Sequence, residues 1–373
     1  MSKETTIKKI SLQFIYFVNI VCLFFLLMSN LAHFLNPSKW WPVALTGLAF
    51  PFLVLAAIAF ILFWLFVNKK KTIISVIILL ISFPGIKRCF AFHLFSEFTE
   101  TKKTGDIRVV TWNVGLMNYE VTDTAVAAAN NEQIFTSLQN LNPDVLCLQE
   151  FFTEVIPGTR YNLIEYTSHR LNLPYYYFSN DRSQFNGTFC SGSIIFSKYK
   201  IIDSSKIVFP KSFTGSVIQA GLLLNNDTVN IITTRLQSFH LQSSDYSALH
   251  DIKNATSGSS AGSNSSIIYK LKYAYTQKLQ QISIVKQLIN NSTRPVIFTG
   301  DLNDMPPTYT YSNIKNNMED AWLDNGFGIG RTFRFIAPTL RIDYIFFDDF
   351  FQAEGTQRIL TTASDHNGLA ADF

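Results

Sequence analysis

The chain has few charged residues and few cysteines for its length. Only 16% of its 373 residues are Asp, Glu, Lys or Arg, whereas about 25% is usual in a soluble domain. This scarcity, together with 47% hydrophobic residues, excludes a disordered chain, which would be rich in charge and poor in apolar residues. The four cysteines are scattered and form no Cys-x-x-Cys pair, which argues against a disulfide scaffold and against a zinc site of that type. The length allows two domains.

Most of the chain also lacks an excess of basic residues. Residues 1–104 hold 11 Lys and Arg against 3 Asp and Glu, a balance of +8, whereas residues 105–373 hold 20 against 24, a balance of −4. A protein that binds long nucleic acid usually has a basic surface, because neutralisation of phosphates drives its affinity. The C-terminal part does not meet that expectation, although a local basic patch can coexist with an acidic average.

Long apolar runs dominate the first hundred residues. Residues 12–35 and 40–67 contain no Asp, Glu, Lys or Arg, and each run exceeds the ~20 residues needed to cross ~30 Å of hydrocarbon. A third run, 72–95, is interrupted by a Pro-Gly pair. We predict a third span there, with a re-entrant or interfacial segment as the alternative. The sequence therefore predicts a membrane anchor over residues 1–97 with about three transmembrane helices.

The distribution of lysines indicates how the anchor is oriented. Residues 1–9 contain three lysines and residues 69–71 are all lysine, whereas the connector between the first two runs has only Lys39. The positive-inside rule places the N-terminus and the triple lysine in the cytoplasm. Basic pairs at 87–88 and 102–103 oppose this orientation. We expect an integral protein of the inner or cytoplasmic membrane, with its C-terminal domain on the outer, periplasmic or extracellular face.

The pattern changes in residues 106–373, where short apolar runs alternate with polar stretches and turn signals. Helices are predicted at 130–140 and 267–291, because apolar residues recur at helical spacing in the second segment. Residues 254–266 form a Ser/Gly/Asn loop. We therefore predict one α/β domain here, joined to the anchor by a linker at 98–105. Its strand candidates are the runs IRVVTWNV, DVLCLQE, SGSIIFSK, VNIITT, RPVIFTG and RIDYIFF.

Several polar side chains lie at or near the ends of these strands, where a rigid scaffold presents functional groups. Each is weak evidence alone, because an Asn after a strand is usually a turn former and a Glu there is usually solvated. Their joint occurrence in one strand pattern predicts a shared site. These residues are Asn113, Glu150, Asp301, Asn303, Asp343, Asp365 and His366.

In their order and approximate spacing, these segments resemble the endonuclease/exonuclease/phosphatase family, which has the deoxyribonuclease I-like fold. The resemblance covers residues 106–373 and implies a four-layer α/β/β/α sandwich, here preceded by transmembrane α-helices. The family includes abasic-site endonucleases, deoxyribonucleases, inositol-polyphosphate phosphatases and neutral sphingomyelinases. It therefore implies hydrolysis of a phosphate ester without fixing the substrate. The motifs that carry the resemblance are TWNV, LQE, GSIIFSK, GDLND, RIDYIF and SDHNG.

The resemblance also implies a metal site and an attacking water. Glu150 would be the main ligand of Mg²⁺, or alternatively Mn²⁺, with Asn113 and Asp365 nearby. A hard divalent cation neutralises the anionic phosphate, and carboxylate oxygens are its natural ligands. Asp301 would orient the water and help to deprotonate it, and Asn303 would donate its amide to a phosphate oxygen.

A histidine would contact the phosphate itself. By the same resemblance, His366 stabilises the charge that develops on the scissile phosphate, and Asp343 holds the imidazole and raises its basicity. The family usually has a second such histidine, in His-Leu-x-Ser, where this chain has Arg235 followed by Leu-Gln-Ser. A second match begins at His240, but we prefer Arg235 because it follows the strand directly. Arginine can clamp phosphate but cannot exchange a proton at neutral pH.

Taken together, these features predict a membrane-tethered, divalent-metal-dependent phosphoesterase. We expect a phosphodiester hydrolase that acts on a small or lipid-linked phosphate. One alternative is an extracytoplasmic nuclease, which would make nucleic acid the substrate. The other is a membrane-bound binding module in which Arg235 has impaired turnover.

Overall fold

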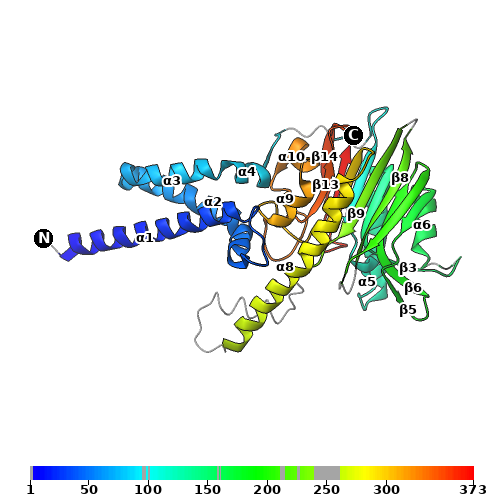
Figure 1. Cartoon of the computed structure of the whole chain (residues 1–373), viewed down its shortest axis with the longest axis horizontal. Helices are drawn as coiled ribbons and strands as arrows, with labels where there is room; N and C mark the ends of the chain where they lie inside the picture. The colour runs from blue at the N-terminus through cyan, green and yellow to red at the C-terminus, as the bar shows by residue number, and fades with distance from the viewer. Residues whose placement is uncertain are drawn as a thin grey trace. The chain divides into compact units, whose positions relative to one another are not determined.

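The computed structural model describes residues 3–94, 98–99, 101–157, 159, 161–210, 215–224, 227–238 and 261–373. The chain divides into two compact units (Figure 1). The helical unit comprises Met1–Phe90 and Met305–Ser312, and the sheet unit comprises Ala91–Asp304 and Asn313–Phe373. The predicted linker at 98–105 includes residue 100, which lies outside the described residues, so the domain boundaries stay a prediction.

The helical unit contains two helices that are long and apolar enough to cross a membrane. The candidate spans are Lys9–Leu31 within the first helix and Trp41–Val67, the whole of the second. Their length follows from uninterrupted apolar sequence, which is the pattern of a membrane-spanning helix. The helices of this unit are α1 (Lys3–Leu31), α2 (Trp41–Val67), α3 (Lys69–Ile81) and α4 (Phe83–Cys89).

The predicted third span is bent. The axes of α3 and α4 differ by 55°, so the pair is either a broken span or a re-entrant loop, the two readings that the sequence left open. The break lies at Ser82, and Pro84 follows in the first turn of α4, where its missing N–H costs no helical hydrogen bond. Asn30, in the last turn of α1, donates its Nδ2 to Ser82 Oγ at 2.8 Å. Helix α4 ends at Cys89, six residues before the predicted end at residue 95.

In the residues that the structure describes, the sheet unit contains two large β-sheets packed face to face. One sheet has the order β14-β15-β2-β3-β6-β4, with β5 paired to β6, and the other has the order β11-β13-β10-β9-β8-β7. One apolar core lies between the sheets and draws on both, for example on Val109 and Ile195 of the first and Ile218 and Ile297 of the second. A second core joins the first sheet to the helices outside it through Phe135. Helices α6 and α8 lie on opposite sides of the two sheets (Figure 1), so the predicted α/β/β/α sandwich is confirmed.

The bounds of the elements follow the predicted strands closely. The first sheet consists of β2 (Arg108–Asn113), β3 (Val145–Glu154), β4 (Tyr175–Phe178), β5 (Arg182–Gln184), β6 (Phe189–Ser197), β14 (Gly355–Ile359) and β15 (Gly368–Asp372). The second consists of β7 (Ile201–Val208), β8 (Ser216–Leu224), β9 (Asp227–Arg235), β10 (Val296–Asp301), β11 (Glu319–Asp320) and β13 (Asp343–Phe347). A short pair joins β1 (Ala91–Phe92) to β12 (Phe327–Gly328). The helices are η1 (Gly115–Asn118), α5 (Thr124–Leu141), α6 (Leu163–Leu171), α8 (Ala261–Asn290), α9 (Tyr309–Lys315) and α10 (Ala321–Asn325).

Two helices begin earlier than predicted. Helix α5 starts at Thr124 rather than at residue 130, because the Asp123 side chain caps it by accepting from two backbone N–H groups of the first turn. Helix α8 starts at Ala261, so the last six residues of the predicted loop are helical. The rest of that loop, 254–260, lies outside the described residues.

The strand register brings the polar strand ends to one edge of the sandwich. Strands β2 and β3 are parallel, with Asn113 opposite Gln149. Strands β9 and β10 are also parallel, with Arg235 opposite Asp301, and β13 is antiparallel to β10, so that Asp343 lies on the other side of Asp301. The carboxyl ends of β2, β9 and β10, the middle of β3 and the start of β13 therefore meet where the two sheets adjoin.

Candidate active site

Asn113 joins the two sheets at this edge. Its Nδ2 donates to Glu150 Oε1 and to Asp301 Oδ2, both at 3.1 Å, and its Oδ1 accepts from the backbone N–H of Gly115 at 3.1 Å. The side chain is 1% exposed. Asn113 therefore acts here as a hydrogen-bond donor that holds two carboxylates side by side, rather than as a group with a free oxygen.

Glu150 is aimed into the site by an irregularity in its strand. The pairing of β3 with β6 shifts register between Leu148 and Phe151, and Glu150 has a positive φ of 50°. A bulge re-aims a side chain, and a non-glycine residue in this conformation carries strain that the surrounding structure must offset. Neighbouring Gln149 anchors the bulge, because its Nε2 donates to Thr111 and, in the opposite sheet, to Thr233.

Arg235 lies against the same carboxylates. Its Nε is 2.6 Å from Glu150 Oε1 and 3.7 Å from Asp301 Oδ2. The side chains of Arg235 and Glu150 are about a quarter exposed, at 27% and 25%, whereas that of Asp301 is fully buried. Arg235, which stands where the family usually has a histidine, thus places a permanently charged guanidinium against Glu150, the predicted main metal ligand. The alternative match to His-Leu-x-Ser, which begins at His240, lies outside the described residues.

Asp301 is held by the residues that follow it in the GDLND motif. Asn303 donates its backbone N–H to Asp301 Oδ1 at 2.8 Å and its Nδ2 to Asp301 Oδ2 at 3.0 Å. The same Nδ2 also donates to the carbonyl of Leu236. Gly300 has a φ of 147°, and a side chain there would collide with the carbonyl oxygen of Thr234, which explains the glycine before Asp301. The Asn303 amide thus orients Asp301, and a bond to phosphate would replace one of these contacts.

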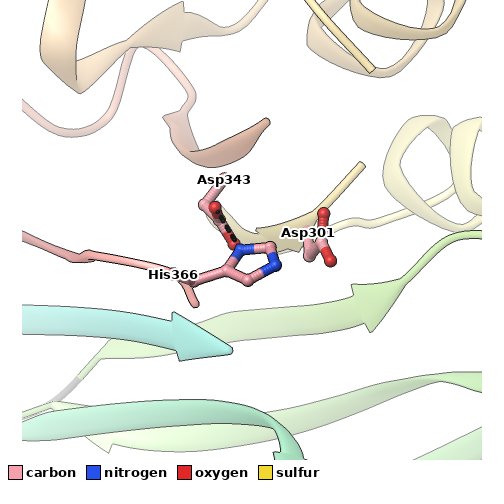
Figure 2. Close-up of side chains that lie close together, drawn as sticks. All are labelled: Asp301, Asp343 and His366. Atoms are coloured by element: carbon pink, nitrogen blue, oxygen red, sulfur yellow. Dashed lines mark hydrogen bonds and ion pairs between the residues drawn. The ribbon is translucent and has the colours of Figure 1, made fainter. Parts of the chain in front are cut away.

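Asp343 and His366 form a buried dyad beside Asp301. His366 Nδ1 lies 2.9 Å from Asp343 Oδ2, and the imidazole and the carboxylate are 6% and 0% exposed. Figure 2 shows the second ring nitrogen of His366 on the side of Asp301. The backbone of His366 is fixed in turn, because its carbonyl accepts from Trp112 Nε1 at 2.9 Å.

The electrostatics of the dyad favour a charged imidazole. Burial alone would lower the pKa of His366, but the charge and hydrogen bond of Asp343, with the charges of Asp301 and Asp365, outweigh burial and raise the pKa to about 10. The imidazole is therefore protonated at neutral pH. The pKa of Asp301 is also raised, first by burial and then by the charge of Asp343, against the lowering effects of His366 and Arg235.

The structure differs from the sequence in how it groups potential metal ligands. Within the described residues, Asp301, Asp343 and His366 offer ligand atoms within 4.8 Å of one another. Asp343 Oδ1 is buried and has no hydrogen-bond partner there, so it is one acceptor that a cation would satisfy. Of the predicted set, Glu150 points into the site, whereas Asp365 is exposed and accepts from Ser364 Oγ. The all-oxygen character of these carboxylates fits a hard divalent cation.

One buried cation at the site was not predicted. Lys278 on α8 is 1% exposed, and its Nζ donates to the Asn303 carbonyl at 2.8 Å and lies 3.5 Å from Asp304 Oδ2. Burial lowers its pKa, against the raising effects of Asp304 and Asp301. The sequence does indicate that Lys278 is buried, because it is four residues before Ile282 and so lies on the apolar face of the helix.

Comparison with known proteins places the sheet unit in a family. The model of the Endonuclease/Exonuclease/phosphatase family matches residues 110–366, and a domain of unknown function (DUF8431) matches residues 12–89. No curated protein matches the chain significantly.

Solved structures also resemble this chain. The human Nocturnin catalytic domain with bound sulfate anion is 17% identical and has a TM-score of 0.50, covering 72% of this chain and 92% of that one. The D. rerio TDP2 complexed with single strand DNA product is 19% identical, with a TM-score of 0.47 and coverage of 72% and 98%. An endonuclease/exonuclease/phosphatase from Beutenbergia cavernae is 17% identical, with a TM-score of 0.49 and coverage of 72% and 71%. At these identities the likeness concerns the fold. Because the family model spans more than half of the chain, this protein belongs to the endonuclease/exonuclease/phosphatase family, whose members hydrolyse phosphoester bonds.

Proposed function

We propose that this protein is a membrane-tethered, divalent-metal-dependent phosphodiester hydrolase that acts on a small or lipid-linked phosphate. The observation that carries the proposal is the buried dyad of His366 and Asp343 at 2.9 Å, beside the carboxylate of Asp301. A protonated imidazole with one nitrogen held by Asp343 has its other N–H available for a phosphate oxygen. This is a preorganised donor for the negative charge that develops during phosphoryl transfer.

The neighbouring residues supply a base and hold it in place. Asp301 would accept the proton of the attacking water, a role suited to a carboxylate whose pKa is raised above its ordinary value. Asn113 and Asn303 both donate to Asp301 and so fix its orientation toward that water. Arg235 would contact a phosphate oxygen as a fixed cation.

Glu150 would hold the divalent cation, with Asp365 nearby and with Asn113 orienting Glu150 through its amide N–H. When bound, the cation neutralises charge on the phosphate and on the developing alkoxide. Mg²⁺ and Mn²⁺ both prefer oxygen ligands of this kind. Because Arg235 already contacts Glu150, we expect the guanidinium and the cation to compete for the same carboxylate oxygen.

The first test is hydrolysis of a generic substrate. The full chain, purified in detergent micelles, should cleave bis(4-nitrophenyl) phosphate in the presence of Mg²⁺ or Mn²⁺ and lose this activity in EDTA. The released nitrophenolate measures the rate. Absence of cleavage with either cation would refute the proposed hydrolase and would favour a binding module.

Arg235→Gln tests the competition at Glu150. We expect the apparent Mg²⁺ affinity to rise severalfold, because a cation 2.6 Å from Glu150 Oε1 is removed. We also expect kcat to fall about tenfold or more, because one donor to the phosphate is lost. Arg294→Gln, which removes an arginine paired with Asp203 away from the site, is the matched control. A faster Arg235→Gln enzyme would instead mean that Arg235 suppresses turnover.

The membrane orientation is proposed from the lysines in the helical unit. We expect the sheet unit to lie on the outer face, because lysine clusters precede the first span and follow the second, whereas the connector between them has only Lys39. Protease added to intact spheroplasts should then remove the sheet unit while a cytoplasmic marker survives. If the sheet unit is protected as well as that marker, the proposed orientation is wrong.

A further inference from the structure

At one end of the helical unit, two aromatic rings hold a lysine. The Lys71 ammonium, in the first turn of α3, lies over the Tyr16 ring of α1, 4.2 Å from its centroid, and over the Trp64 ring of α2 at 4.5 Å. The two rings meet edge to face, with centroids 5.9 Å apart. Aromatic faces attract cations, so three helices together fix the position of one positive charge. We refer to Tyr16, Trp64 and Lys71 as the Lys71 corner.

Hydrogen bonds near the Lys71 corner keep these helices in register. Asn68 alone joins α2 to α3, and its side chain caps α3 by accepting from the backbone N–H of Lys70 at 3.2 Å. One turn further along α3, the fully buried side chains of Ser75 and Asn19 hydrogen-bond to each other. Side chains that hydrogen-bond across apolar helices hold the helices together. The Lys71 ammonium is therefore held in place before any ligand binds.

The charge at the Lys71 corner has no counterion nearby in the helical unit. Residues 5–96 and 305–312 contain no Asp or Glu, and Glu4 is twelve residues before Tyr16, about 18 Å further along α1 at 1.5 Å per residue. Within the described residues, the Lys71 ammonium makes no ion pair and no hydrogen bond, so its three N–H groups have no acceptor. The corner thus has a fixed positive charge that an anion from outside the unit can balance.

Two more side chains at the corner have unused hydrogen-bonding capacity. Trp64 is 0% exposed, and its indole Nε1 has no hydrogen-bond partner in the part of the chain that the structure describes. The same holds for Oγ1 of Thr72, which follows Lys71. A buried polar group without a partner costs free energy, and a ligand that accepts hydrogen bonds removes that cost. A phosphate group combines negative charge with several acceptor oxygens.

The Lys71 corner lies at the end of an apolar segment. The candidate span Trp41–Val67 ends four residues before Lys71, and Lys69 and Lys70, which come between them, are exposed. In a bilayer, the end of a spanning helix lies at the level of the lipid head groups, where Trp and Tyr side chains gather. The anion available at that level is a lipid phosphate.

We propose that the Lys71 corner binds the phosphate of an anionic phospholipid. The Lys71 ammonium donates to the phosphate oxygens, while the exposed charges of Lys69 and Lys70 favour a lipid with net negative charge over a zwitterionic one. The site shares no residue with the proposed active site. The proposal uses the membrane anchor of the proposed function but not its hydrolysis, so either can fail without the other.

Lipid titration tests the proposal. The full chain in detergent micelles with EDTA would be titrated with phosphatidylglycerol or phosphatidylcholine, and native mass spectrometry would count the bound lipids. We expect phosphatidylglycerol to bind about tenfold tighter than phosphatidylcholine, and equal affinities would overturn the proposal. Soluble glycerol 3-phosphate carries the same phosphate chemistry, and we expect an excess of it to leave the lipid bound. Displacement of the lipid would identify a site for soluble phosphate and would overturn the assignment to a lipid.

Lysine variants show whether the binding depends on this corner. Lys71→Met should lower the phosphatidylglycerol affinity about tenfold, because the ammonium held by the rings is lost. Lys39→Met removes the same charge from the exposed connector between α1 and α2 and should bind like wild type. If the two variants bind equally well, the lipid preference comes from net charge alone and the proposed site is wrong.

Variants of Tyr16 change the ring without changing the charge. Tyr16→Leu should weaken phosphatidylglycerol binding severalfold, because the Lys71 ammonium loses one of the two rings that hold it. Tyr16→Phe keeps the ring face and should bind like wild type. Thermal unfolding of both variants in the same micelles checks that the chain stays folded. Wild-type affinity of folded Tyr16→Leu would contradict the proposal, because the rings would then not position the cation.

Discussion

Asp301→Asn should lower kcat at least about a hundredfold while leaving the Mg²⁺ affinity near that of wild type. Positioned acid–base groups contribute about 10²–10⁴ in rate. The substitution keeps the size of the side chain, which is fully buried, but deletes the charge that makes it a base. Asn113 and Asn303 both donate to Asp301 Oδ2, so the variant keeps a carbonyl oxygen for these contacts in one orientation of its amide.

Glu150→Gln distinguishes the role of metal ligand, assigned to Glu150, from the role of base, assigned to Asp301. Because Glu150 is assigned to the cation, its variant should lose Mg²⁺ affinity as well as rate, and Mg²⁺ should partly restore the rate. Hydrolysis of bis(4-nitrophenyl) phosphate over a Mg²⁺ titration, with binding followed by calorimetry, distinguishes the two variants. Recovery of the full rate by Asp301→Asn at high Mg²⁺ would make Asp301 a ligand and would reverse the two roles.

The sequence predicts the composition of the site better than its contacts. Strand patterns and motif order place Asn113 and Asp301 at strand ends and Asp343 inside RIDYIFF, and in the structure Asp343 begins β13 at the same edge. The alignment of β9 with β10 follows from parallel pairing, which brings carboxyl ends together. The ion pair between Arg235 and Glu150 does not follow from either strand alone, because it depends on the bulge that gives Glu150 its positive φ.

Sequence patterns could not predict features that are built from several segments far apart in the chain. A cavity of about 390 Å³ is lined by residues of η1, β3, the β5–β6 hairpin, β8 and β9, which come together only when the two sheets meet. Lys278 was visible as a charge on an apolar helix face, but its partner Asp304 belongs to a loop 26 residues later. The bend at Ser82, in contrast, lies beside the Pro-Gly pair that interrupts the third apolar run of the sequence.

Asp343→Asn should lower the rate above neutral pH about a hundredfold and move the alkaline limb of the pH–rate profile downward. Asp343 supplies the largest contribution that raises the pKa of His366 to about 10, while burial opposes it. Without that carboxylate, burial is opposed only by the charges of Asp301 and Asp365, so we expect the pKa of His366 to fall toward its ordinary value of 6.5. The imidazole is then neutral at pH 8 and no longer places a positive charge on the phosphate.

The raised pKa of His366 also makes the stability of the folded protein depend on pH. A pKa raised from 6.5 to about 10 means that the dyad stabilises the folded state fully below pH 6.5, and that this contribution is lost as pH rises through 10. Thermal unfolding of wild type should therefore show this loss between pH 6.5 and pH 10, and Asp343→Asn should not. Asp349→Asn, an exposed carboxylate just beyond β13, is the matched control. If Asp343→Asn keeps the wild-type alkaline limb, His366 does not act as a cation, and the charge on the phosphate must be balanced by Arg235 and the metal.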